Sequence, residues 1–167
     1  MNPRNEARKM RTRHAEAAIL FAVGPYKFAI AASEVDEIRD MHGLAPTLLR
    51  SAPIALRKVR YLLRRERRNY YVVDASMHFH LKPSDPARVM VLRGGLVALT
   101  ADSIDRMTEI TAIAPLPRAF QGEETKWFRG VTLIENAVVP VVNSKTVLTN
   151  AEVELARAVL AAEGATA

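Results

Sequence analysis

The sequence predicts a mainly β protein made of two structurally equivalent halves with a helix at its C-terminus, and three observations support this fold class. Short apolar runs alternate with turn signals, as in residues 20–32, where Gly24 and Pro25 interrupt the run and indicate a β-hairpin. The order of these runs repeats later in the chain. From Asn150 onward the apolar residues fall at helical spacing instead, and Asn150 is a favourable N-cap.

The repeat has a constant offset of 69 positions. This shift places residues 20–38 on residues 89–107 without a gap, ten apolar positions coincide, and Asp74 falls on Asn143. Hydrophobic hairpins resemble one another, so coincidence is an alternative, but one ungapped register over about 55 positions argues against it. Each unit is too small to bury a large core alone, so the two copies are expected to pack together.

After the first hairpin, residues 33–38 are expected to form a short helix. Ser33 can cap it, and Val35 and Ile38 share one helical face while the acidic residues between them point to water. The repeat carries the same expectation to the acidic residues Asp102 and Asp105.

A second strand pair is predicted at residues 59–63 and 70–73, joined through a run of arginines. Asp74 or Ser76 can then cap a helical turn. Residues 41–49 are ambiguous, because glycine and proline favour a short strand or loop over a helix there.

Composition limits the class of protein. The apolar fraction of 49% and charged fraction of 25% are ordinary for a globular chain. The absence of cysteine excludes a disulfide framework, a thiolate metal site and a cysteine nucleophile. No stretch approaches the roughly 20 apolar residues that a membrane-spanning helix needs, and no signal peptide is apparent. A cytoplasmic location is therefore expected.

The net charge of +6 is unevenly distributed. Residues 1–14 carry +4 and residues 57–68 carry +6, whereas the rest of the chain sums to −4. The basic excess thus belongs to one terminal arm and one internal stretch on a slightly acidic body.

Several segments resemble the CheW-like domain family of bacterial chemotaxis. The opening hairpin, the Val-x-Glu-Ile-Arg pattern, the strand before Asp74 and the two closing strands carry the resemblance, at residues 21–30, 35–39, 70–74, 128–131 and 138–143. The sequence departs from the family at residues 61–67, where Tyr61 and Arg67 stand in place of two glycines. The position of the family's arginine falls on Glu66. A shift of the alignment by one or two residues would place Arg64, Arg65 or Arg67 there.

The resemblance implies two small five-stranded β-barrel subdomains related by a pseudo-two-fold, with short helices and a C-terminal helix. It implies a flexible basic arm at 1–16, a CheW-like domain at 17–149 with interlocked halves of about 17–85 and 86–149, and a C-terminal helix and tail at 150–167.

It also implies a non-catalytic adaptor that couples a chemoreceptor to a CheA-type histidine kinase, or that acts in a related motility or surface-behaviour pathway. The expected partners are the regulatory domain of the kinase and the receptor's cytoplasmic tip, which in the family lies in the groove between the barrels. No cofactor, metal or catalytic residue is expected. The candidate partner-binding residues are Val35, Glu37, Ile38, Arg39, Arg64, Arg65 and Arg67.

The arginine stretch 57–68 has three interpretations. Arginine and tyrosine on strands could bind single-stranded nucleic acid, which is the alternative function. The stretch could be a basic strand edge that resists self-pairing, or it could bind an acidic protein partner. His78 and His80 could suggest a metal site, but surface histidines are the simpler interpretation.

Overall fold

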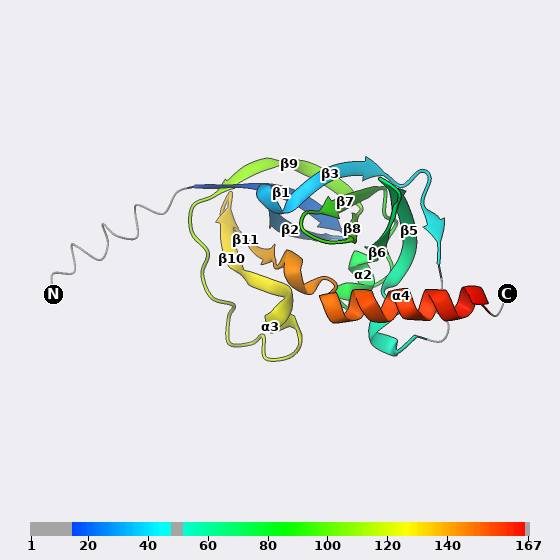
Figure 1. Ribbon diagram of the computed structural model, residues 1–167. Coiled ribbons are helices and arrows are strands. Elements are labelled where there is room, and N and C mark those ends of the chain that lie inside the picture. The colour runs from blue at the N-terminus through cyan, green and yellow to red at the C-terminus, as the bar shows by residue number, and fades with distance from the viewer. Residues whose placement is uncertain (1–14, 48–51, 166–167) are drawn as a thin grey trace.

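The structure is a computed structural model that describes residues 15–47 and 52–165, and its strands form two sheets (Figure 1). The first sheet contains β1 (Glu16–Val23), β2 (Tyr26–Ala31), β9 (Ser103–Ile110), β10 (Phe128–Ile134) and β11 (Ala137–Val142), in the order β10-β11-β2-β1-β9. The second contains β3 (Val35–Asp40), β4 (Ala45–Pro46), β5 (Val59–Arg65), β6 (Arg68–Val73), β7 (Arg88–Leu92) and β8 (Val97–Ala101), in the order β3-β7-β8-β6-β5-β4.

The helices are short except for the last one. They are η1 (Ala32–Glu34), η2 (Ile54–Leu56), α2 (Ala75–His78), α3 (Glu124–Trp127), η3 (Ser144–Thr146) and α4 (Asn150–Ala165). The predicted C-terminal helix is confirmed, and it runs along the edge of the molecule opposite β3 and β9 (Figure 1). Its buried residues Val153 and Ala156 join the central core. Strands outnumber helices among the described residues, so the predicted mainly β fold class is confirmed.

The repeat of 69 positions is confirmed by the boundaries of the strands. The offset carries β5 onto β10 and β6 onto β11 residue for residue. The turns agree as well: Glu66 and Arg67 have φ angles of 52° and 63°, and Glu135 and Asn136 have 50° and 64°. Such paired positive φ angles are typical of the tight type I′ hairpin turn.

Each sheet combines strands from both halves of the chain. The hairpin β1–β2 pairs with β9 and β11 of the second half, and the hairpin β7–β8 pairs with β3 and β6 of the first half. Each half therefore donates its first hairpin to the sheet of the other. Strand β1 begins inside the predicted arm 1–16, and residues 1–14 of that arm lie outside the described residues.

Three clusters form the core. One lies within each sheet, and most of their members correspond through the repeat: Leu20, Ala29, Val139 and Val141 in the first match Val89, Ala98, Tyr70 and Val72 in the second. The third and largest cluster lies between the two halves. Each central strand is buried on both faces, with each face packed against a different cluster. The central strands are therefore apolar on both faces and do not alternate apolar with polar residues.

Aromatic rings occupy the centre of the shared cluster. Phe28 stacks on Phe21, Phe79 and Phe128 with ring centroids 5.7, 4.6 and 6.0 Å apart. These residues come from the donated hairpin β1–β2, from the residue after α2 and from β10, so the stack joins the two halves.

The strand ladders of the described residues form two open sheets, so the closed-barrel part of the prediction is not confirmed. In the first sheet, the segment that follows the outer strand β9 reaches the other outer strand, β10, through an isolated bridge between Ala114 and Val131, with hydrogen bonds of 2.8 and 2.9 Å. The equivalent contact in the second sheet is the pairing of Ala45 in β4 with Leu62 in β5. These short contacts bring the sheet edges together without a continuous ladder.

The helix predicted over residues 33–38 is wrong. A single 3₁₀ turn at η1 is followed by strand β3, and Ser33 lies inside this turn, whose N-cap residue is Ala31. A β-bulge between Val35 and Glu37 interrupts the alternation of the strand, and this places apolar residues three positions apart, as in a helix. Asp102 and Asp105 likewise precede and occupy strand β9 rather than a helix.

The predicted cap at Asp74 is confirmed. Its Oδ1 accepts hydrogen bonds from the Ser76 amide at 2.9 Å, the Ser76 hydroxyl at 2.6 Å and the Met77 amide at 3.3 Å. We expect Asp74→Ala to lower the free energy of unfolding by about 1–2 kcal/mol, because the first amides of α2 lose their acceptor. Asp74→Asn keeps an acceptor oxygen and is expected to cost less than half as much in urea denaturation. Equal losses in the two variants would contradict the cap.

Candidate functional site

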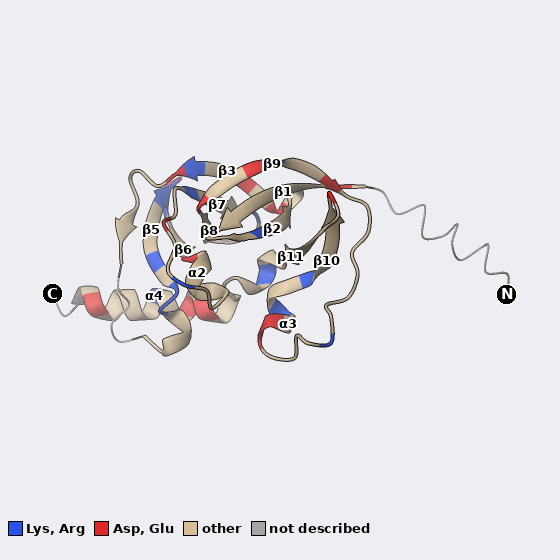
Figure 2. Ribbon diagram, turned by 180° about the vertical axis from the view of Figure 1, so that it is seen from behind, with Lys and Arg blue, Asp and Glu red and all other residues tan. Residues whose placement is uncertain are grey.

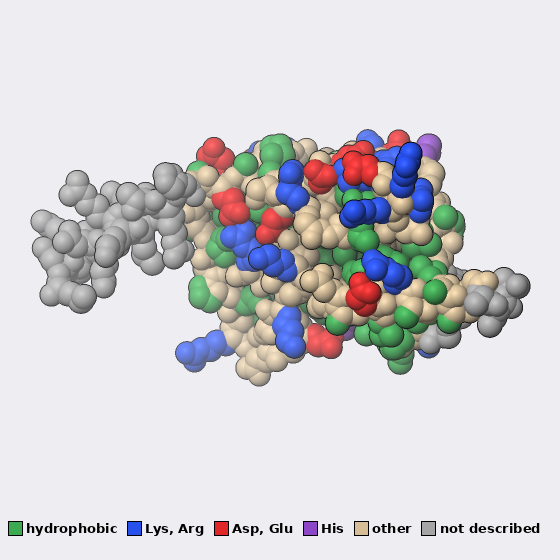
Figure 3. All heavy atoms as spheres, in the orientation of Figure 1, with side chains coloured by type: hydrophobic (Ala, Val, Ile, Leu, Met, Phe, Trp, Pro, Cys, Tyr) green, Lys and Arg blue, Asp and Glu red, His purple; other side chains and the backbone are tan. Residues whose placement is uncertain are grey.

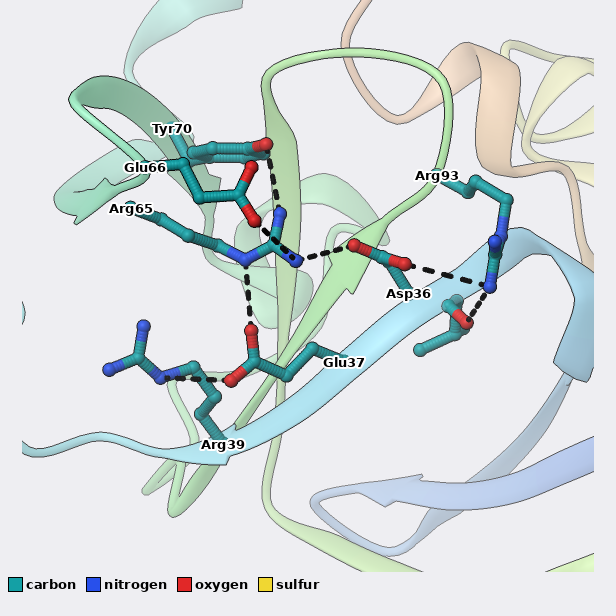
Figure 4. Close-up of polar contacts among 8 residues, drawn as sticks. Asp36, Glu37, Arg39, Arg65, Glu66, Tyr70 and Arg93 are labelled. Atoms are coloured by element: carbon teal, nitrogen blue, oxygen red, sulfur yellow. Dashed lines mark hydrogen bonds and ion pairs between the residues drawn. The ribbon is translucent and has the colours of Figure 1, made fainter.

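A network of ion pairs joins the outer strand β3 to β5, and it contains three of the predicted partner-binding residues (Figure 4). The Arg65 guanidinium lies between two carboxylates of β3, with Nη2 2.5 Å from Asp36 Oδ2 and Nε 2.9 Å from Glu37 Oε2. Its Nη1 donates to the Tyr70 hydroxyl at 3.0 Å. Arg65 therefore links two strands of the second sheet that are not neighbours in the ladder.

Further charges extend this network along the edge. Arg39 Nε lies 3.6 Å from Glu37 Oε1, and Arg93 Nη2 lies 3.6 Å from Asp36 Oδ1. The Glu66 carboxylate is 3.9 Å from Arg65. The hydrogen bonds of Arg65 to Asp36 and Glu37, followed by that to Tyr70, raise the pKa of its guanidinium, so Arg65 stays cationic. The network thus presents alternating charges at the surface.

The hairpin turn decides which arginine reaches β3. The two-residue turn at Glu66 and Arg67 pairs Arg65 with Arg68 and Arg64 with Asn69. Successive residues of a strand point to opposite faces, so Arg65 faces β3 while Arg64 faces the other way. Of Arg64, Arg65 and Arg67, Arg65 is the one that bonds the carboxylates of β3.

The predicted site residues fall into three groups. Glu37, Arg39 and Arg65 form the network at the β3 edge. Ile38 lies beside them with 40% of its surface exposed, whereas Val35 is 7% exposed and belongs to the shared core. Arg64 and Arg67 line a separate hollow. Val35 therefore offers no surface to a partner.

A second surface is a groove of about 570 Å³ between the two halves, where the family resemblance implies a groove but the sequence named none of its residues. We call it the central groove. Its walls come from equivalent segments of the repeat, residues 54–58 and 77–80 in the first half and 123–127 and 146–149 in the second. Ile54, Met77 and Trp127 are its large apolar residues, and Ile54 is 78% exposed. The repeat offset could have indicated it, because it pairs η2 with the region of α3.

Lys58, which is half-buried, and His78, which is buried, form a polar pair in the wall of the central groove. The Lys58 ammonium lies 3.2 Å from His78 Nδ1, so this nitrogen accepts and the proton of the neutral ring is on Nε2. Nε2 is buried and has no hydrogen-bond partner. Burial, with the nearby charges of Lys58 and His80, lowers the pKa of His78 to about 3. Burial also lowers the pKa of Lys58, an effect that Glu152 and Glu123 oppose.

The prediction that both histidines lie at the surface is wrong for His78, which is 4% exposed. His78 packs against Phe79 and Trp127, whereas His80 is exposed and has a φ angle of 52°. The helical turn of α2 places the first ring in the core and the second at the surface, an outcome that the alternation of a strand does not predict.

Within residues 15–47 and 52–165, no helix is both long and apolar enough to cross a bilayer.

Comparisons with known proteins agree with this geometry. The crystal structure of the scaffolding protein TtCheW from Thermoanaerobacter tengcongensis superposes with a TM-score of 0.69 at 12% sequence identity, covering 83% of this chain and 96% of that chain. This likeness shows a shared fold. No curated protein matches the sequence. The family model of the CheW-like domain matches residues 17–152, which are most of the chain. The protein therefore belongs to the CheW-like domain family, a family of chemotaxis scaffold and adaptor proteins.

Proposed function

We propose that this protein is a non-catalytic adaptor that couples a chemoreceptor to a CheA-type histidine kinase, or that performs the same task in a related motility or surface-behaviour pathway. The observation that carries the proposal is that the scaffold offers two separate surfaces. The β3 edge and the central groove share no residue, and β3 lies at the top of Figure 1, whereas α3 and α4, which contribute to the groove, lie at the bottom. An adaptor needs two such surfaces to bind two partners at once.

The β3 edge has the features of a protein interface. Ile38 is an exposed apolar residue flanked by the charges of Glu37, Arg39 and Arg65. An apolar centre with a charged rim is typical of transient interfaces. We assign this edge to the regulatory domain of the kinase, because that domain has the same fold in the family and can present a complementary sheet edge.

The central groove suits a helical partner. Ile54 and Trp127 supply apolar surface, and Lys58, Lys126 and Glu123 supply charges of both signs around it. An amphipathic helix places apolar anchors at spacings of three and four residues, and a groove of this composition accommodates them. We assign the groove to the receptor's cytoplasmic tip.

Nucleic-acid binding is not proposed. That alternative relied on Tyr61, Tyr70 and Tyr71 to stack with bases, but Tyr70 and Tyr71 are only 7% and 3% exposed and Tyr61 is half-buried. Buried rings provide no stacking platform.

Two matched variants test the assignment of the surfaces. Ile38→Glu is expected to weaken binding of the kinase regulatory domain at least about tenfold and to leave receptor-tip binding unchanged, and Ile54→Glu is expected to do the reverse. Both side chains are exposed, so neither substitution disturbs the core. Binding is measured by biolayer interferometry with each immobilised partner.

Each variant is the control for the other. A wild-type protein that binds neither partner at micromolar concentration would overturn the adaptor proposal. If one variant lost both partners while its thermal melt matched the wild type, the division into two surfaces would be incorrect.

A further inference from the structure

A hollow lined by four arginines lies between the β5–β6 hairpin and α4. We call it the arginine groove, and its lining residues are Arg64, Arg67, Arg68, Asn69, Tyr71, Leu96 and Arg157. Figure 3 shows basic side chains gathered above α4 on this face, with hydrophobic side chains between them. The groove shares no residue with the central groove.

The arginines of this groove are poorly neutralised. Arg64 donates to Asn69 Oδ1 at 3.4 Å, and within residues 15–47 and 52–165 no carboxylate forms an ion pair with Arg64, Arg67 or Arg68. Arg157 pairs with Glu154 at 3.4 Å, and both side chains are more than half exposed. The neighbouring Arg65 is held by two carboxylates instead. Uncompensated like charges on one hairpin destabilise it, so their presence is unexplained by folding.

The basic surface continues along α4. A second hollow shares Leu96 and Arg157 with the arginine groove and adds Arg93 and Lys145. Of the described residues that line the two hollows, Glu154 is the one carboxylate. Together the hollows form a cationic strip with an apolar floor at Leu96, which suits an extended anionic chain rather than a single small ion.

Three observations identify the occupant. The chain's own undescribed segments are unsuitable, since residues 1–14 carry a net charge of +4 and residues 48–51 add an arginine. A nucleic acid would need exposed aromatic rings, and Tyr71 in the groove is 3% exposed. The second hollow also contains the carboxylate of Glu154, which would repel a long polyanion more than a short acidic segment.

We propose that the arginine groove binds a short acidic polypeptide segment of a partner protein. Guanidinium groups form two parallel hydrogen bonds with a carboxylate, and the Glu or Asp side chains of such a segment would supply the missing counter-charges. Apolar residues between the acidic ones would lie on Leu96. This contact is additional to the two surfaces of the adaptor proposal and does not depend on them.

The test uses the full chain and a fluorescein-labelled eight-residue peptide of alternating glutamate and leucine. Fluorescence anisotropy at 50 mM salt is expected to show saturable binding that weakens when the salt is raised, because exposed charges are screened. The double variant Arg64→Glu/Arg68→Glu should bind at least about tenfold more weakly. The control Lys82→Glu/Arg118→Glu makes the same charge change at exposed positions outside the groove and should bind within about twofold of the wild type.

Equal losses in the two double variants would overturn the proposal, because they would show a general effect of net charge. So would the absence of saturable binding at 50 mM salt. If an eight-residue thymidine oligonucleotide or inorganic phosphate displaced the peptide at equal concentration, the commitment to a polypeptide would be incorrect. Should circular dichroism show that the Glu variant is unfolded, Arg64→Gln/Arg68→Gln replaces it, with a loss of at least about threefold expected from the removal of charge alone.

Discussion

Replacement of Gly130 by alanine is expected to lower the free energy of unfolding by about 2–4 kcal/mol. Gly130 has a φ angle of 151°, and a Cβ atom there would lie 2.3 Å from the Ala114 carbonyl oxygen and 2.6 Å from Ile113 Cγ2. Both neighbours belong to the segment that bridges β9 to β10. The methyl group would therefore push this segment away and break the contact that joins the two edges of the first sheet.

Gly95→Ala is the matched control, because an added Cβ at Gly95 meets no atom within 4 Å and the backbone is not strained. This variant should stay within about 0.5 kcal/mol of the wild type or gain slightly in stability. Urea denaturation followed by circular dichroism measures both variants. A Gly130→Ala protein as stable as the control would contradict the tight crossing at Ala114.

Acidification is expected to destabilise the protein through His78. The pKa of His78 is about 3 in the folded protein, whereas it is near 6.5 for an ordinary histidine. Between these two pH values only the unfolded chain takes up the proton, so falling pH favours unfolding. Above pH 6.5 the ring is neutral in both states and makes no contribution. The expected loss from His78 is about 2 kcal/mol between pH 6.5 and pH 5.

The variant His78→Gln removes the titrating ring and keeps an acceptor oxygen for Lys58, so its stability should fall less steeply over the same range. His80→Gln is the control, since His80 is exposed, and it should retain the wild-type slope. Free energies of unfolding at pH 7, 6 and 5 give the comparison. Identical slopes for the wild type and His78→Gln would show that another group carries the acid sensitivity.

The strand pairs and the repeat could be predicted because they depend on local signals. Apolar runs such as Tyr70–Val73 are separated by turn residues, and one offset aligns them with the second half. Asp74 could be recognised as a cap for the same reason. In contrast, the strand at Val35–Asp40 contains a bulge that mimics helical spacing, so its local pattern was misleading.

The candidate sites depended on contacts between distant residues. The run of arginines does not show whether Arg64 or Arg65 faces β3, because the φ angles at Glu66 and Arg67 set the direction of each side chain. The partners of Arg65 lie 28 and 29 positions earlier in the sequence, on a strand that was expected to be a helix. The central groove combines segments of both halves, and His78 is buried by Trp127 from the other half. Such arrangements follow from the packing of the halves.

The exchange of hairpins also determines how this chain can fold. Strand β1 lies beside β9, so residues such as Glu16 and Ile110 must meet across a long loop before the first sheet exists. Closing such loops is entropically unfavourable, and chains dominated by distant contacts fold slowly. A nascent chain released only as far as β8 has no partner strand for the outer side of β1. The first hairpin therefore stays without its partner strand during synthesis until β9 has been made. A fragment that ends before β9 would expose an apolar strand edge prone to aggregation.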